Sequence, residues 1–332
     1  MCPPDIAVVV CTYNRAEMLR NALRSLTLQQ TDGAFSYEIL VIDNGSTDPT
    51  KVVIAEIAAS SPVAVNYVRE ETKGLAQALN RGVREARGTW LAFCDDDNLA
   101  EANWLKGLLS AASVTKAKLV GGTRRLQLPS GGGLVLGPTC RGLLGEYVND
   151  GTDSVCQGKR TPPGGNLLIA REVFESIGLF DTSMVMSGED CDFVKRARAS
   201  GITVAISATA IVHHVIPPYR VTPSYLRWTS LRFGCLLAYM DCKNSGRAKM
   251  FSCLVARIGQ AIVVNLPLLV ASVLTRNATE SLDRKCLLWR ALGYAGGTAS
   301  VAAPRLFEQA HFYSRLEFRK ERAAFSQSKA LR

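Results

Sequence analysis

Apolar residues in the first third of the chain follow two alternating spacings. Short continuous runs rich in β-branched residues predict strands, and these runs cover residues 6–11, 37–42, 63–68 and 89–94. The segments between them carry apolar residues at helical spacing and predict helices over residues 15–29, 50–59 and 74–86. Continuous apolar strands separated by helices predict an α/β fold with a mostly parallel, doubly wound sheet flanked by helices.

Polar residues stand where three of these strands end. The first strand runs into Thr12 and Asn14, the second into Asp43, and the fourth into the adjacent carboxylates of residues 95–97. Ligands of such sheets bind at the carboxyl ends of the strands. Adjacent carboxylates repel one another unless a counter-ion neutralises them, and their oxygens suit magnesium or manganese bound together with substrate phosphates. The alternative is a solvated turn or a helix cap, because Asp is common in turns and residues 98–103 resemble a helix start.

Two other phosphate-binding classes are disfavoured at the first strand. No Gly-x-Gly-x-x-Gly and no Walker-type loop follows it, which argues against a dinucleotide enzyme and a P-loop phosphotransferase. A sugar nucleotidyltransferase should carry a Gly-rich basic loop at the same place, and residues 12–15 do not supply one.

Charge divides the chain into two parts. Residues 1–216 carry 21 Lys or Arg against 23 Asp or Glu, whereas residues 217–332 carry 18 against 6. The basic part contains the uncharged run 258–275, whose 18 residues just reach the length of a membrane-spanning helix, and the shorter run 291–304. Basic residues flank both runs, so the pattern favours a membrane surface over nucleic acid as the partner. A buried helical hairpin packed on the globular part is the alternative.

The N-terminus and the cysteines bear on location. No basic segment precedes the first apolar strand, so no secretory signal is predicted. The ten cysteines form no Cys-x-x-Cys pair, and several lie inside apolar strands, as expected for small core residues in a reducing compartment. We therefore expect the globular part on the cytoplasmic side of a membrane.

Several ordered motifs resemble one family. Residues 8–15, 38–48 and 93–98, followed by Pro163-Gly-Gly-Asn166, residues 177–181 and residues 187–193, are similar to the family 2 glycosyltransferases of the GT-A fold. The resemblance covers roughly residues 5–240. It implies a GT-A nucleotide-sugar glycosyltransferase domain over residues 1–240, followed by a basic, apolar, helical region over residues 241–332.

The resemblance also implies roles for particular residues. Asp95 and Asp97 correspond to the two ends of a metal-binding Asp-x-Asp motif, with His213 as a further candidate ligand for manganese or magnesium. Asp190 resembles the general base of an inverting transfer, which takes the proton of the acceptor hydroxyl. Substrate-binding roles fall to the residues that line the other motifs, namely Thr12, Asn14, Arg15, Asp43, Asn44, Lys73, Asp96, Asn166 and Glu189.

Other readings of these residues stay open at this point. The pair Glu189-Asp190 would also suit the first turn of a helix, where the helix dipole favours acidic residues. Adjacent residues on a strand point to opposite faces, so only one of His213 and His214 can face the site. Arg220, Arg227 and Arg232 suit either phosphate neutralisation or a solvated basic face.

The expected activity follows from the resemblance. It implies transfer of a single sugar from a nucleotide-diphosphate sugar, with uridine the commonest nucleoside and thymidine or guanosine as alternatives, to a glycan or lipid-linked acceptor in cell-envelope polysaccharide or glycolipid synthesis. Two departures from the family pattern are visible. Leu79-Asn80 stands where relatives often carry Arg-Asn, and residues 224–228 lack the Gln of the processive synthases. A catalytically silent nucleotide-binding or membrane scaffold with the same fold is the rival interpretation.

Overall fold

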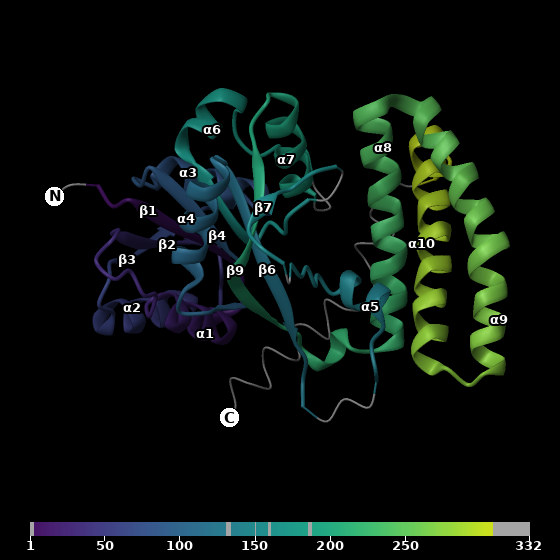
Figure 1. Cartoon of the computed structure of the whole chain (residues 1–332), viewed down its shortest axis with the longest axis horizontal. Helices are drawn as coiled ribbons and strands as arrows, with labels where there is room; N and C mark the ends of the chain where they lie inside the picture. The colour runs from purple at the N-terminus through teal and green to yellow at the C-terminus, as the bar shows by residue number, and fades with distance from the viewer. Residues whose placement is uncertain (1–2, 131–133, 150, 159–160, 185–187, 308–332) are drawn as a thin grey trace. The chain divides into compact units, whose positions relative to one another are not determined.

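The computed structural model describes residues 3–130, 134–149, 151–158, 161–184 and 188–307. Its contacts divide the chain into two units (Figure 1). The first holds residues 1–127 and 147–215, and the second holds residues 128–146 and begins again at residue 216, as far as each is described. The expected boundary at residue 240 falls inside a helix of the second unit, and the functional division of the chain stays a prediction.

The first unit is an α/β layer structure built on one sheet. Its strands are β1 (Ile6–Thr12), β2 (Tyr37–Asp43), β3 (Val65–Arg69), β4 (Trp90–Cys94), β5 (Asn98–Ala100), β6 (Leu119–Gln127), β7 (Ser154–Val155), β8 (Asn166–Ala170) and β9 (Val204–Val215). Its helices are α1 (Ala16–Leu26), α2 (Thr50–Ser60), α3 (Leu75–Glu85), α4 (Trp104–Thr115), α6 (Arg171–Ile177) and α7 (Glu189–Ala199). The strand order is β3-β2-β1-β4-β8-β6-β9-β5, with β7 paired to β9.

The predicted fold class is confirmed, and each strand and helix expected in the first third of the chain is present within a few residues. Strands β1 to β4 are parallel to one another, whereas β8 runs antiparallel to β4 and β6. The prediction that a helix starts within residues 98–103 was wrong, because the helix begins later. Residues 98–100 form the short strand β5, which pairs with β9, and α4 begins only at Trp104.

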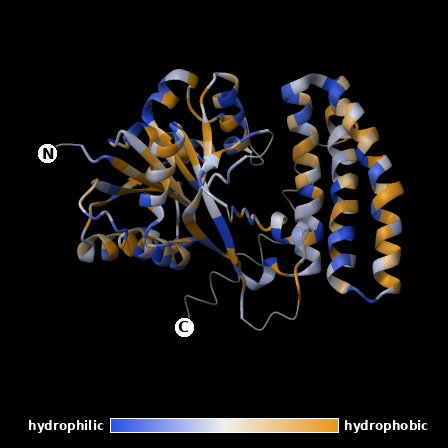
Figure 2. Ribbon diagram, in the orientation of Figure 1, coloured by the Kyte–Doolittle hydropathy of each residue, from blue (hydrophilic) through white to orange (hydrophobic). Residues whose placement is uncertain are grey.

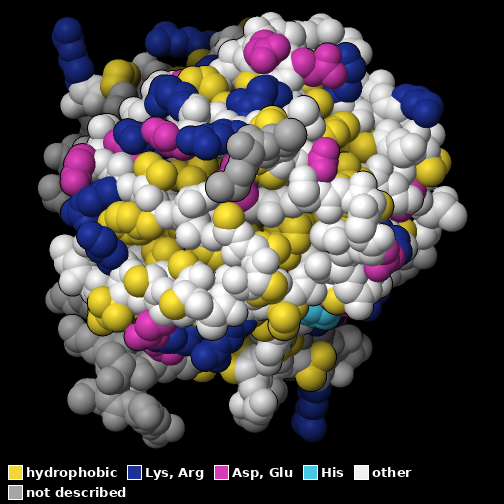
Figure 3. Space-filling model, turned by 90° about the vertical axis from the view of Figure 1, so that its left-hand side faces the viewer, with side chains coloured by type: hydrophobic (Ala, Val, Ile, Leu, Met, Phe, Trp, Pro, Cys, Tyr) yellow, Lys and Arg dark blue, Asp and Glu magenta, His cyan; other side chains and the backbone are white. Residues whose placement is uncertain are grey.

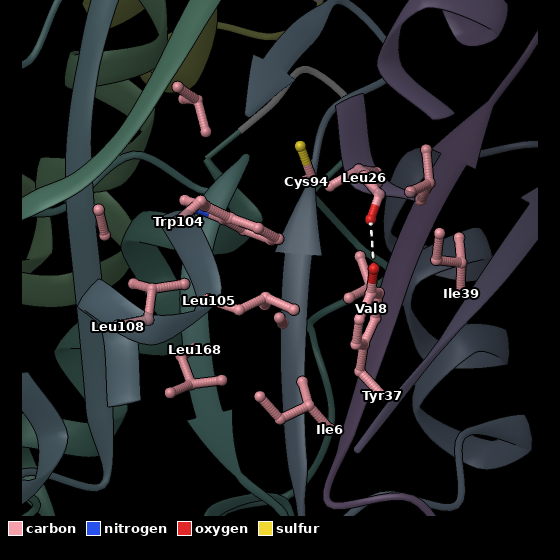
Figure 4. Close-up of a cluster of buried hydrophobic side chains, with 14 of the residues drawn as sticks. Ile6, Val8, Leu26, Tyr37, Ile39, Cys94, Trp104, Leu105, Leu108 and Leu168 are labelled. Carbon is pink, nitrogen blue, oxygen red and sulfur yellow. Dashed lines mark hydrogen bonds between the residues drawn. The ribbon is translucent and has the colours of Figure 1, made fainter. Parts of the chain in front are cut away.

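Alternate residues of β1 build a core on each face of the sheet. Val8 and Val10 lie in one apolar cluster, and Ala7 and Val9 lie in the other, as the two-residue period of a strand requires. Figure 4 shows the first cluster, in which the hydroxyl of Tyr37 donates a hydrogen bond of 3.0 Å to the carbonyl of Leu26. Because apolar side chains cover both faces of the sheet, the polar side chains of these strands lie at the strand ends.

The parallel register brings two of those ends together. Thr12, the last residue of β1, pairs with Asp43, the last residue of β2. Acidic and basic side chains are interspersed over the face shown in Figure 3, in keeping with the near balance of 21 basic and 23 acidic residues in residues 1–216.

The second unit is helical. It contains α5 (Pro138–Leu143), a 3₁₀ turn (Pro218–Arg220), α8 (Pro223–Gln260), a π-helical turn (Ala261–Asn265), α9 (Leu266–Leu274) and α10 (Ala278–Ala302). Gly246 interrupts α8 with a φ of 79°, a backbone conformation that side-chain-bearing residues rarely adopt. A Cβ at Gly234 would lie 2.0 Å from the carbonyl oxygen of Arg290, so this glycine lets α8 and α10 pack closely.

Candidate active site

The three carboxylates after β4 point in different directions. Asp96 is buried and accepts hydrogen bonds from the Thr12 hydroxyl at 2.8 Å and from the Arg15 guanidinium at 2.7 Å. These contacts use both of its carboxylate oxygens and tie the end of β4 to the end of β1. Asp96, Thr12 and Arg15 therefore hold one another in place in the cluster, and their expected substrate-binding roles stay a prediction.

Asp97 lies beside a histidine of β9. Its Oδ2 is 3.1 Å from the Arg15 guanidinium and 3.4 Å from Nε2 of the buried His214. Alternation along β9 turns His213 to the opposite face, where its Nε2 lies 2.9 Å from Glu101. The structure therefore does not bring the expected ligand His213 to the cluster and places His214 there instead.

Asp95 faces a cavity. Its carboxylate lies 3.5 Å from the guanidinium of Arg124 on β6, and 44% of its side chain stays exposed. Enclosure by protein atoms and, after it, the neighbouring Asp97 raise the pKa of Asp95 to about 6, although Arg124 and His214 act in the opposite direction. The raised pKa means that the charged carboxylate is disfavoured here, and a positively charged ligand would stabilise it.

Two glycines pack closely against acidic side chains at this cavity. A Cβ at Gly165 would lie 1.9 Å from Oδ2 of Asp95, and a Cβ at Gly164 would lie 2.7 Å from Oδ2 of Asp190. No larger residue fits without displacing these carboxylates. Packing therefore explains why the loop before β8 contains consecutive glycines.

Asp190 occupies the first turn of α7, where the helix dipole favours a carboxylate. Its Oδ2 accepts a hydrogen bond of 3.0 Å from the backbone N–H of Gly164, and its Oδ1 accepts one of 2.7 Å from the N–H of Cys191. Each oxygen keeps a further lone pair for another donor. The preceding residue, Glu189, is buried beside it.

One cavity of about 220 Å³ brings these groups together. Its wall contains Asp95, Arg124, Gly164, Gly165, Glu189 and Asp190, and its floor contains apolar side chains from β1, α3, β4 and β8, among them Val9, Leu79, Phe93 and Leu167. Of the residues predicted from the sequence, Asp95, Glu189 and Asp190 line this cavity. Arg124 was not predicted, because a single arginine on a strand carries no motif.

A second polar group surrounds Asp43, which is buried. One of its oxygens accepts a hydrogen bond of 2.7 Å from the N–H of Ser46, and the other accepts one of 3.0 Å from the hydroxyl of Tyr67. The Asn14 side chain accepts from the N–H of Thr47 at 2.8 Å and so holds the same turn. This group forms the polar end of β1 and β2 beside the cluster at β4.

Asn44 and Lys73 stabilise the neighbouring loop. The Asn44 amide donates to the carbonyls of Glu70 and Thr72 and accepts from the N–H of Gly74. The Lys73 ammonium donates to the carbonyls of Asn44 and Gly45, each at 2.8 Å, and lies 4.2 Å from the centroid of the Tyr13 ring. Both residues thus shape the rim near Asp43, and their expected substrate-binding roles stay a prediction.

Asn166 does not reach the site. It is fully buried, its amide nitrogen donates to the carbonyls of Thr123 and Ala210, and its oxygen accepts from the Trp104 indole at 2.8 Å. All these partners belong to the sheet and to α4, so the contacts of Asn166 in the structure are structural ones, and its expected substrate-binding role stays a prediction.

The donor set suits a hard divalent cation that also binds substrate. Within the described ranges, no group of three or more His, Cys, Asp or Glu side chains is arranged to hold a metal ion by itself. Magnesium and manganese sites of phosphate-transferring enzymes commonly use only one or two carboxylates, with substrate oxygens completing the shell. Asp95 and Asp97, with His214 at their side, fit that arrangement.

Comparisons with known proteins agree on the family. Residues 7–178 match the family model described as glycosyl transferase family 2. The chain is 29% identical over 216 residues to the glycosyltransferase AglE of Haloferax volcanii, covering 65% of this chain and 68% of that protein. It is also 29% identical over 233 residues to the succinoglycan biosynthesis protein ExoM of Rhizobium meliloti, covering 69% of this chain and 72% of that protein.

A solved structure shares the fold. The mannosyltransferase PcManGT of Pyrobaculum calidifontis, determined in complex with GDP-Man and Mn2+, superposes with a TM-score of 0.57 at 18% identity, covering 89% of this chain and 88% of that one. The family model spans more than half of the 332 residues. The chain is therefore a member of glycosyl transferase family 2, and it is a glycosyltransferase by family.

Proposed function

We propose that the protein is an inverting, divalent-cation-dependent glycosyltransferase. It transfers a single sugar from a nucleotide-diphosphate sugar, most simply a UDP-sugar, to a glycan or lipid-linked acceptor. The observation that carries this proposal is the cavity lined by Asp95, Arg124 and Asp190. It brings a carboxylate suited to a cation, Asp95, and a carboxylate suited to a base, Asp190, to the same cavity.

The cavity suits the sugar rather than the whole donor. Its volume of about 220 Å³ is below the roughly 300 Å³ at which pockets for drug-sized ligands begin. We assign the donor sugar to it and the nucleoside to the polar group around Asp43 at the ends of β1 and β2. The diphosphate then lies over the cluster of residues 95–97, between the two.

Each protein group has a chemical task in this arrangement. Asp190, held by the N–H groups of Gly164 and Cys191, takes the proton of the acceptor hydroxyl as that oxygen bonds to the anomeric carbon. The bond from the anomeric carbon to the phosphate oxygen breaks, and its electron pair leaves with the nucleoside diphosphate. Arg124 is placed to stabilise the charge that develops there.

The cation would be held by Asp95 and Asp97 with His214 beside them. When bound, it supplies Lewis-acid stabilisation of the departing diphosphate. The buried ion pair of Arg15 with Asp96 and Asp97 fixes the carboxylates in place before the ion arrives.

The names of the relatives and the composition of the second unit support a setting for the reaction. ExoM is named for succinoglycan biosynthesis, which supports a role in cell-envelope polysaccharide or glycolipid synthesis. One helical segment of the second unit, Pro223–Leu274, is long and apolar enough to cross a membrane by length and composition. We place the enzyme on the cytoplasmic side of a membrane, in association with it.

Calorimetric titration of UDP, GDP and dTDP, with and without manganese, tests the donor site. We expect one nucleotide to bind the wild type in a manganese-dependent manner and to lose that dependence in Asp97→Ala. Asp190→Asn should bind the same nucleotide normally and transfer no sugar. Normal nucleotide binding by a wild type that transfers no sugar to any acceptor preparation would favour the silent scaffold, and absence of nucleotide binding would exclude the donor site.

A further inference from the structure

Two arginines of the second unit face one another across its helices. Arg257 lies near the end of α8 and Arg290 lies on α10, and both line a small cavity of about 10 Å³ together with Gln260, Asn265 and Leu287. Burial and, after it, the neighbouring Arg257 lower the pKa of Arg290. Two guanidinium groups that line one small cavity repel one another unless an anion binds between them.

The chain supplies no carboxylate to this pair within the described residues. Residues 216–307 contain three acidic side chains, and each has another partner. Asp241 accepts a hydrogen bond of 2.8 Å from the Tyr294 hydroxyl, Glu280 pairs with Arg284 at 2.6 Å, and Asp283 accepts from two backbone N–H groups of α5. The pair therefore keeps its positive charge available for a ligand.

The geometry around the pair favours an oxygen-rich anion. The Arg257 guanidinium stacks 4.6 Å from the centroid of the Tyr294 ring, which fixes its plane, and its Nε is buried without a hydrogen-bond partner among the described residues. Asn265 is buried in the π-helical turn, and its oxygen accepts from Arg284 at 3.2 Å. Its amide nitrogen is consequently a third donor beside the two guanidinium groups.

An exposed apolar surface adjoins these donors. The side chains of Ile262, Val263, Val270, Val273 and Leu274 are 60%, 73%, 54%, 56% and 78% exposed. The most apolar stretch of the helical segment Pro223–Leu274 is only 6% buried, and Figure 2 shows the apolar colour concentrated along α9. A phosphate next to hydrocarbon is the chemistry of a lipid headgroup.

We propose that Arg257, Arg290 and Asn265 form a binding site for the phosphate headgroup of an anionic membrane lipid. The exposed apolar side chains of the π-helical turn and α9 lie in the hydrocarbon beside it, as in interfacial helices. This site rests on the membrane association included in the proposed function, but not on sugar transfer or on the donor site of the first unit.

The test compares charge-conserving variants of the full chain. Lysine keeps the positive charge but cannot bind phosphate in a bidentate manner. We expect Arg257→Lys/Arg290→Lys to lose about tenfold in affinity for phosphatidylcholine vesicles that contain phosphatidic acid, measured by sedimentation. The matched control, Arg247→Lys/Arg276→Lys, changes two exposed arginines of the same unit and should bind like the wild type.

Four outcomes decide the matter. Equal affinities of the two double variants would show that only overall charge attracts the protein, and would overturn the site. A wild type that binds vesicles equally with and without phosphatidic acid would overturn it as well. Calorimetric binding of pyrophosphate without vesicles, lost in Arg257→Lys/Arg290→Lys, would assign the pair to a soluble anion. The predicted loss, with unchanged circular dichroism and unchanged manganese-dependent nucleotide binding, supports it.

Discussion

Asp95→Asn should stabilise the metal-free protein at neutral pH. The pKa of Asp95 is raised from its ordinary value of 3.8 to about 6, so the folded state holds a proton more tightly than the unfolded chain does. The charged carboxylate therefore costs stability above pH 6, and the cost falls as the pH drops from 6 through 3.8 and disappears well below 3.8, where both states are protonated. Asparagine resembles the protonated carboxyl group and carries no such cost at any pH.

The size of the effect follows from the same shift. A rise from 3.8 to about 6 corresponds to about 3 kcal/mol at about 1.4 kcal/mol per pKa unit. The side chain is 44% exposed, and solvent screening at this exposure reduces the expected gain to about 1 kcal/mol. The gain should grow from a small fraction near pH 4 to its full value near pH 7.

Urea unfolding followed by circular dichroism at pH 4 and pH 7.5 measures this gain. A matched control is Asp32→Asn, because Asp32 is an exposed carboxylate paired with Lys106, and its removal should change stability by less than about 0.5 kcal/mol. Manganese with the cognate nucleotide should reverse the order, because only the wild type can bind the ion. A metal-free Asp95→Asn protein that is less stable than the wild type at pH 7.5 would refute the reasoning.

Three further predictions concern single positions. Gly165→Ala places a methyl group on the Asp95 carboxylate and should lower manganese-dependent nucleotide affinity by at least about tenfold in calorimetry, while an unchanged affinity would show that the loop moves freely. His214→Gln should weaken the same affinity whereas His213→Gln should not, and the opposite result would restore His213 as the ligand. Asp283→Asn should destabilise the helical unit by about 1 to 3 kcal/mol in thermal unfolding, because two charge-assisted backbone hydrogen bonds are weakened, and an unaltered transition would contradict this.

The local sequence pattern predicted the strands and the polar residues at their ends. It did not predict contacts between residues that are far apart in the sequence. The strands and the cluster at residues 95–97 were predicted because apolar runs and their polar ends are adjacent in sequence. Arg124 and the contact of Gly165 with Asp95 depend on β6 and β8 reaching the end of β4, which no nearby residue encodes. The choice between His213 and His214 depends on the phase of β9, which the alternation of two adjacent residues leaves open.

The charge balance of the site predicts an order of binding. Five carboxylates, those of residues 95–97, 189 and 190, gather at or beside the cavity, where the guanidinium groups of Arg15 and Arg124 also lie. A diphosphate brings further negative charge to this place, so the metal-free site should repel the donor. A divalent cation reverses the sign of that interaction, because it shares carboxylate and phosphate oxygens. We therefore expect the cation to bind before or together with the donor, and nucleotide affinity to rise with manganese concentration until the carboxylates are neutralised.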